Sequence, residues 1–272
     1  LIALSFFVLT ALALHATEFR FRGLTYTLLT DSTVEVSGIA PAYVGGVSIL
    51  DEVMHDSVVY TVVAIGNSAF EYAKGVNYVM LPSTLRQIGD SAFRGCVSLG
   101  AIATPANLLS VGKAAFSECA SLRSISLPDT MLSIGESAFA DCASLKHIKI
   151  PTGIKQIEDR TFEHCSSLVS VRIPKGVLTL GSNAFSHCSL LASIDLPDGV
   201  ISIGNAAFYN CESLRDVSVP ASVVAIGQEA FEHTLWLDDQ PDGVLYVNDV
   251  LYKYKGKMSP NTTIVIRKEV VS

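Results

Sequence analysis

Apolar residues recur along most of this chain with a period of 23 residues. Within each period, one segment carries apolar side chains three and four positions apart, as at Ala138, Phe139 and Cys142. This spacing predicts a short amphipathic helical turn. The next segment, LKHIKI at 145–150, ends in alternating apolar and polar residues and predicts a short strand. Pro151 then ends the strand, because proline has no N–H to donate to a ladder.

The period is almost invariant for phenylalanine, proline and cysteine, and nearly so for glycine, which Glu158 replaces once. The phenylalanines are Phe70, Phe93, Phe116, Phe139, Phe162, Phe185, Phe208 and Phe231. A unit of this size cannot bury its apolar side alone, so successive units must stack and pair their strands in parallel. We predict an α/β fold: a leucine-rich-repeat solenoid with one parallel, curved sheet.

The repeated motif I-G-x-x-A-F-x-x-C-x-S-L-x-x-I-x-L-P, seen at 111–128, 134–151 and 203–220, resembles the BspA-like leucine-rich repeats of bacterial and protist surface proteins. The resemblance covers about residues 63–231. It implies secretion or surface display and adhesion, with some members binding host extracellular-matrix proteins. Because the motif consists of core residues, the resemblance transfers no binding site.

The segments outside the repeats predict a modular organisation. Residues 1–16 form an apolar run and a small-residue exit, which indicate a truncated signal peptide; the run is short for a membrane span. Residues 17–63 predict a β-rich N-terminal cap, and residues 64–234 hold about eight repeats. Two strand-like runs around Asn248 and Asp249 predict a hairpin insertion within 235–263. Residues 264–272 resemble the start of a further repeat, cut off.

Charge narrows the classes of function. The net charge is −7 and only 17% of the residues are charged, whereas nucleic-acid-binding domains usually carry a basic excess. The same deficit of basic residues disfavours attachment to a membrane surface. We therefore expect no binding to nucleic acid. From the predicted signal peptide we expect a secreted or cell-surface chain that does not insert into a membrane once mature, and we further expect a monomer.

No combination of residues supports catalysis, and we predict no enzyme activity and no cofactor. The six cysteines follow the 23-residue period, so we expect a buried, unpaired column; three disulfides are the alternative. Zinc is disfavoured, because this spacing gives a line of thiols. His164 and His187 with Asp141 offer a possible metal site, although polar residues on a solvated turn explain the pattern equally well.

The outward positions of the predicted strands are the better candidates for binding. Successive strands place a cluster of basic residues in the middle of the chain, with an aromatic residue nearer the N-terminus: Arg123, Lys146, His147, Lys149, Arg172 and Tyr78. Such a cluster attracts an acidic protein segment or an acidic glycan, and protonation of His147 would strengthen it. The alternative is a solvated face with ordinary scatter of charge.

A second candidate is an aromatic patch in the predicted hairpin segment, formed by Trp236, Tyr246, Tyr252 and Tyr254. Exposed aromatic rings stack on sugars or anchor proteins, but these rings also suit packing of the hairpin onto the last repeat. The sequence favours an adhesion module that binds a host matrix or cell-surface protein on its concave strand face. A carbohydrate-binding module and a structural spacer that displays a further domain are the alternatives.

Overall fold

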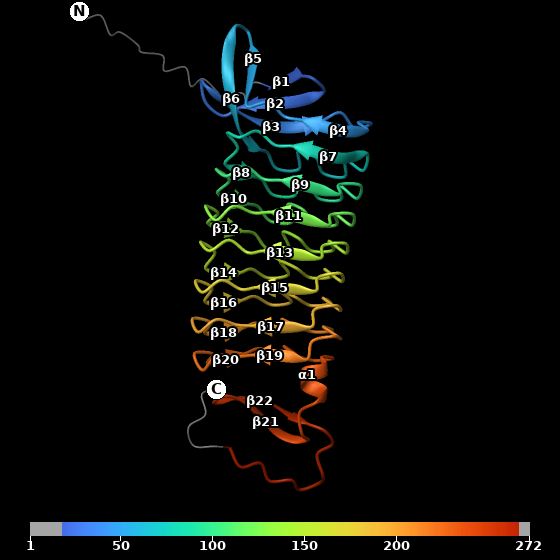
Figure 1. Ribbon diagram of the computed structural model, residues 1–272, viewed down its shortest axis with the longest axis vertical. Coiled ribbons are helices and arrows are strands. Elements are labelled where there is room, and N and C mark those ends of the chain that lie inside the picture. Colours follow the sequence, from blue (N-terminus) through green and yellow to red (C-terminus); the bar gives the residue numbers. More distant parts are fainter. Residues whose placement is uncertain (1–17, 267–272) are drawn as a thin grey trace, which may run out of the picture.

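A computed structural model describes residues 18–266 of the chain (Figure 1). The predicted signal peptide at 1–16 and the last residues of the predicted further repeat lie outside this range. The described residues form a solenoid in which the repeats stack as a straight column in the view of Figure 1. Within them, no helix has the length and apolar character needed to cross a membrane.

Each repeat contributes two short strands, where the sequence predicted one. The first ladder consists of β7 (Val76–Met80), β9 (Ala101–Ala103), β11 (Ser124–Ser126), β13 (His147–Lys149), β15 (Ser170–Arg172), β17 (Ser193–Asp195) and β19 (Asp216–Ser218). The second ladder consists of β8 (Gln87–Ile88), β10 (Ser110–Val111), β12 (Ser133–Ile134), β14 (Gln156–Ile157), β16 (Thr179–Leu180), β18 (Ser202–Ile203) and β20 (Ala225–Ile226). All the pairs within the two ladders are parallel, although strand pairing is interrupted between β15 and β17 in the first ladder and between β12 and β14 in the second. Each repeat is therefore one turn of a β-solenoid.

The predicted helical turn is wrong: the segment between the second strand and the cysteine is a run of tight turns. Ser137 and Asp141 adopt φ values of 56° and 60°, which a right-handed helix excludes. Their N–H groups donate instead to the next repeat, to the carbonyl oxygens of Asp159 and Glu163. Apolar residues nevertheless recur three and four positions apart in this segment, because the turns, like a helix, direct Ala138, Phe139 and Cys142 into the core.

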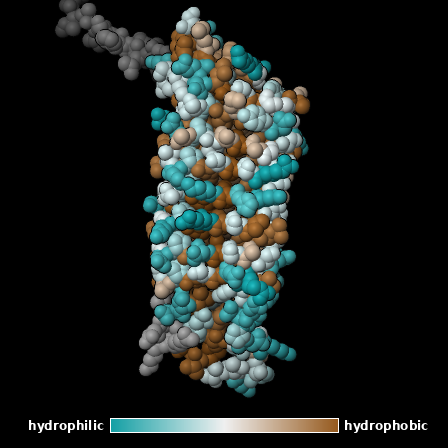
Figure 2. Space-filling view, viewed as in Figure 1, coloured by the Kyte–Doolittle hydropathy of each residue, from teal (hydrophilic) through white to brown (hydrophobic). Residues whose placement is uncertain are grey.

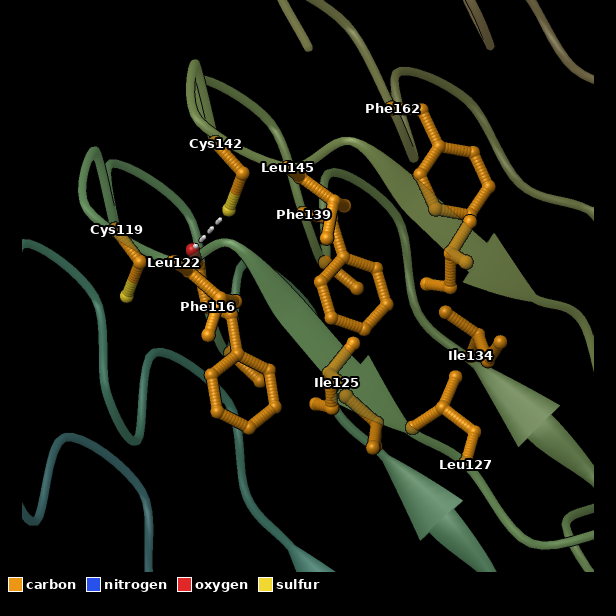
Figure 3. Close-up of a cluster of buried hydrophobic side chains, with 14 of the residues drawn as sticks. Phe116, Cys119, Leu122, Ile125, Leu127, Ile134, Phe139, Cys142, Leu145 and Phe162 are labelled. Atoms are coloured by element: carbon orange, nitrogen blue, oxygen red, sulfur yellow. Dashed lines mark hydrogen bonds between the residues drawn. The ribbon is translucent and has the colours of Figure 1, made fainter. Parts of the chain in front are cut away.

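The core is a set of identical residues stacked along the solenoid axis (Figure 3). The phenylalanine rings from Phe70 to Phe231 are fully buried and lie nearly parallel, with neighbouring centroids 4.9 to 5.7 Å apart. The cysteine column is buried and unpaired, as predicted. Each thiol donates to a phenylalanine carbonyl of the preceding repeat, as Cys142 does to Phe116 at 3.1 Å. The thiol therefore links repeats while it fills the core.

The N-terminal end of the stack is covered by β-structure. The strands are β1 (Glu18–Phe21), β2 (Leu24–Leu28), β3 (Thr33–Ile39), β4 (Gly45–Ser48), β5 (Glu52–His55) and β6 (Val58–Ile65). Strand β4 pairs in parallel with β7, and β6 pairs in parallel with both β3 and β8, so both ladders continue into this region. Buried residues such as Tyr26, Val34 and Val36 extend the core of the repeats.

The C-terminal end is covered by a short helix, α1 (Leu235–Asp238), and a hairpin of β21 (Gly243–Val247) and β22 (Val250–Lys255). Thr234 caps the helix, its hydroxyl accepting the N–H of Leu237. Residues 264–266, which the sequence assigns to the start of a further repeat, form no strand and are exposed. The hairpin thus packs on the last described repeat, at Phe231 and Glu232.

Candidate functional site

The outward residues of the first ladder form a regular surface, which we call the strand face. Its positions align across strands: Tyr78 lies opposite Ala101, Ser124 opposite His147, and Lys149 opposite Arg172. The buried residue of each strand, such as Ile148, points into the core between two exposed neighbours. The strand face therefore presents rows of side chains along the solenoid, one from each repeat.

The structure brings together the five basic residues that the sequence singled out, each within or directly before one of the adjacent strands β11, β13 and β15. We call Arg123, Lys146, His147, Lys149 and Arg172 the basic cluster; all five are exposed. Arg123 and Lys146 lie on neighbouring repeats, since the N–H of Lys146 donates to the carbonyl of Arg123.

The basic residues differ in how far they are neutralised. Lys149 Nζ lies 2.7 Å from Asp129 Oδ2, and this hydrogen bond, with a weaker one from the N–H of Thr152, lowers the pKa of Asp129. Within residues 18–266, Arg123, Lys146 and Arg172 form no ion pair. The uncompensated charge of the basic cluster therefore comes from these three side chains.

Tyr78 is not part of this cluster. Strand β9, with the small residues Ala101 and Ala103, separates Tyr78 from β11. Tyr78 is 49% exposed and lies instead on the exposed side of β7 with Met80, opposite Gly46 of β4. The sequence reasoning missed Gly46 as the residue opposite Tyr78, because β4 lies in the cap and follows no repeat.

The aromatic residues of the C-terminal segment pack largely on the last repeat. Trp236 lies against Phe231 with centroids 4.7 Å apart, and Tyr252 meets the same ring edge-on at 5.8 Å. The Tyr252 hydroxyl accepts the N–H of Phe231, and burial raises the pKa of Tyr252 to about 12. Tyr246 and Tyr254 are half-buried. These rings close the end of the core, and only Trp236 also borders a surface hollow, of about 420 Å³, beside β17 and β19.

A larger groove, of about 1000 Å³, runs along the ends of β13, β15 and β17 where the chain leaves the strand face. We call it the strand-end groove. Its floor includes Ile150, Ile173 and Leu196, and its rim carries Lys149, Arg172, Lys175, Asp195 and Asp198. On the same side of the molecule, Figure 2 shows an apolar band between two polar flanks along the stack. The sequence reasoning missed Lys175 and Asp198. Each directly follows a strand-ending proline, where a charged residue suggests only a solvated turn.

The cysteines and histidines do not form a reactive centre. Burial raises the pKa of every thiol, to about 12 for Cys96 and Cys211, which disfavours the thiolate needed for nucleophilic attack or metal binding. The rings of His164 and His187 stack face to face, with centroids 4.2 Å apart. In the described part of the chain, no three histidine, cysteine or acidic residues are placed to hold a metal ion.

Comparison with known proteins agrees with this architecture. The family model described as the BspA type leucine rich repeat region, in six copies, matches residues 63–191 and 110–238. A leucine rich cell surface protein from Faecalibacterium prausnitzii A2-165 has 23% identity and a TM-score of 0.68, over 79% of this chain and 73% of that chain. The T. pallidum leucine rich repeat protein has 27% identity and a TM-score of 0.52, over 64% and 91%.

A leucine-rich repeat protein from Eubacterium ventriosum ATCC 27560 has 23% identity and a TM-score of 0.54, over 81% of this chain and 50% of that chain. No curated protein matches the chain. The family match spans more than half of the chain, and its repeats coincide with the two-stranded turns of the solenoid. The chain therefore belongs to the BspA type leucine-rich-repeat family.

Proposed function

We propose that this chain is a secreted or surface-displayed, non-catalytic module that binds an extracellular protein on its strand face, through the basic cluster. The observation that carries the proposal is the concentration of uncompensated positive charge in one part of an acidic chain. Arg172 lies on β15, Arg123 and Lys146 directly precede β11 and β13, and all three are exposed. They form no ion pair within residues 18–266, while the net charge of the chain is −7.

The surroundings of the basic cluster support a binding role. Towards the N-terminus the strand face carries only Ala101 and Ala103 on β9, so a partner can approach the backbone closely. Towards the C-terminus the sign of the charge changes at Asp195 and Asp216, both exposed. A surface with this order of charges selects the orientation of a partner as well as attracting it. Family membership and the similarity to a bacterial cell surface protein agree with an extracellular location.

The test is binding of the purified chain to a panel of extracellular-matrix proteins at low and at physiological ionic strength. We expect saturable binding that weakens as salt is added, because exposed charges are screened. The Arg123→Ala/Lys146→Ala variant should weaken binding about tenfold, as the loss of two favourable charges of about 0.7 kcal/mol each.

The matched control is Lys74→Ala/Arg86→Ala, which removes the same charge from exposed positions outside the strand face. This control should bind within about twofold of the wild type, since distant exposed charges are screened at physiological salt. Equal losses in both variants, or no saturable binding to any matrix protein, would contradict the proposal.

A further inference from the structure

Three consecutive repeats depart from the others at one turn position, the second residue after the strand-ending proline. In other repeats this residue is Thr84, Asn107, Thr130 or Ser222. Its side chain donates a hydrogen bond to a carbonyl of the preceding repeat, as Thr130 does to Leu108 at 3.0 Å and Ser222 to Val200 at 2.7 Å. In the three exceptional repeats the residue is Gly153, Gly176 or Gly199, and this hydrogen bond is lost.

The fold does not require glycine at two of these positions. Neither Gly176 nor Gly199 adopts positive φ. A Cβ atom would lie 3.2 Å from its nearest neighbour, which is Lys155 Nζ at position 176 and the Lys175 carbonyl at position 199, so that neighbour must move by a few tenths of an ångström. The carbonyl that a hydroxyl would reach lies 3.5 to 3.6 Å from this Cβ. Gly153 differs, because its Cβ would lie 2.4 Å from the carbonyl of Met131. The glycines at 176 and 199 therefore give up an available contact between repeats.

What these glycines provide instead is space. Gly176 and Gly199 line the strand-end groove, which spans the repeats of Lys149, Arg172 and Asp195. The phenylalanines of these three repeats are 5.7 and 5.2 Å apart, so the groove extends over two such steps along the axis.

The chemistry of the rim indicates the ligand. Arg172 and Lys175 are exposed and form no ion pair within residues 18–266, and the Arg172 guanidinium can bind a carboxylate or sulfate through two parallel hydrogen bonds. One step further along the groove, Asp195 and Asp198 offer only hydrogen-bond acceptors. A ligand that suits both ends carries an anionic group beside hydroxyl donors. A chain of acidic residues would meet repulsion at the two aspartates.

We propose that the strand-end groove binds an acidic oligosaccharide, with its carboxylate or sulfate on Arg172 and Lys175 and its hydroxyl groups on Asp195 and Asp198. The site shares Arg172 with the basic cluster, but Lys175, Gly176 and Gly199 lie outside the strand face, so changes at these three positions test it separately from the proposed protein partner.

The test measures binding of four probes by calorimetry: a carboxylated tetragalacturonate, a sulfated heparin tetrasaccharide, neutral maltotetraose and tetraglutamate. The Gly176→Thr/Gly199→Thr variant fills the groove with the side chain that Thr84 and Thr130 place in other repeats, so it should keep its thermal stability. We expect this variant to bind the acidic sugars at least about tenfold more weakly, because the added threonine side chains occupy space that the ligand needs. Lys175→Ala should weaken binding roughly two- to fivefold.

The control Ala106→Thr adds a side chain at an exposed turn outside the groove and should bind as the wild type does. Binding of one or both acidic sugars, lost in the filled variant, supports the site and identifies the anion. The assignment is overturned if neither acidic sugar binds, if the filled variant binds them normally, or if maltotetraose or tetraglutamate binds as well. Failure here leaves the strand-face proposal intact, because that proposal is tested by Arg123 and Lys146.

Discussion

Replacement of Phe139 tests whether the stacked phenylalanines hold the repeats together. Phe139 is fully buried between Phe116 and Phe162, with centroids 5.5 and 5.7 Å away and rings within 3° of parallel. Phe139→Ala removes the ring and leaves a cavity, so we expect a loss of about 3–5 kcal/mol in the free energy of unfolding. Phe139→Leu keeps much of the apolar volume but removes two ring contacts of about 0.5–1.5 kcal/mol each, a loss of roughly 1–3 kcal/mol.

The matched control is Phe70→Leu, at the N-terminal end of the stack. Among the described phenylalanines, Phe70 has one stacked neighbour in the column, Phe93, at 4.9 Å. Its replacement by leucine should therefore cost about half as much as Phe139→Leu. Urea unfolding followed by far-ultraviolet circular dichroism measures all three variants against the wild type, with the slope against urea compared as well. A cost for Phe139→Leu equal to or below that of Phe70→Leu would refute the stacking argument.

Three further predictions concern single groups. Because burial raises the pKa of all six thiols, the native chain should not react with a thiol reagent at about pH 8, whereas the urea-unfolded chain should expose six; reaction of the native chain would contradict this. The pKa of His187 is lowered, first by burial and then by His164, so the unfolded state binds more protons as the pH falls below 6.5 and stability is lost there. His187→Gln should reduce the fall in melting temperature between about pH 7 and about pH 5, and an unchanged fall would contradict the sign. Tyr252→Phe leaves the Phe231 N–H without its acceptor and should cost about 1–3 kcal/mol in urea unfolding, whereas a neutral effect would show that the hydroxyl contributes nothing to the C-terminal end.

The sequence predicted the features that repeat. Phe139 and Cys142 are identified as core residues because identical residues stack, and the strand at 147–149 follows from alternation. The second ladder was missed because a strand of two residues, such as Gln156–Ile157, is too short to show alternation. The helical turn was predicted wrongly because the spacing of apolar residues does not reveal positive φ at Ser137 and Asp141.

In the candidate site, too, only the features that follow the 23-residue repeat were predictable. The basic cluster follows from the period, since Arg123 and Lys146 occupy equivalent positions one repeat apart. The pairing of Lys149 with Asp129 joins residues twenty positions apart, at a distance that is not the period. The strand-end groove was missed because Gly176, in a turn after a proline, suggests ordinary turn chemistry until the hydrogen bonds of the other repeats are seen.

The strand face as a protein-binding surface is tested most directly by lysine footprinting. The chain, alone and bound to the matrix protein it captures, is acetylated under mild conditions, and the modification of each lysine is measured by mass spectrometry. Lys146 lies exposed in the basic cluster, whereas Lys113 lies exposed in the turn after β10 of the second ladder. We predict that the partner protects Lys146 and leaves Lys113 unchanged. Protection of Lys113 with full modification of Lys146 would place the partner on another face and contradict the account.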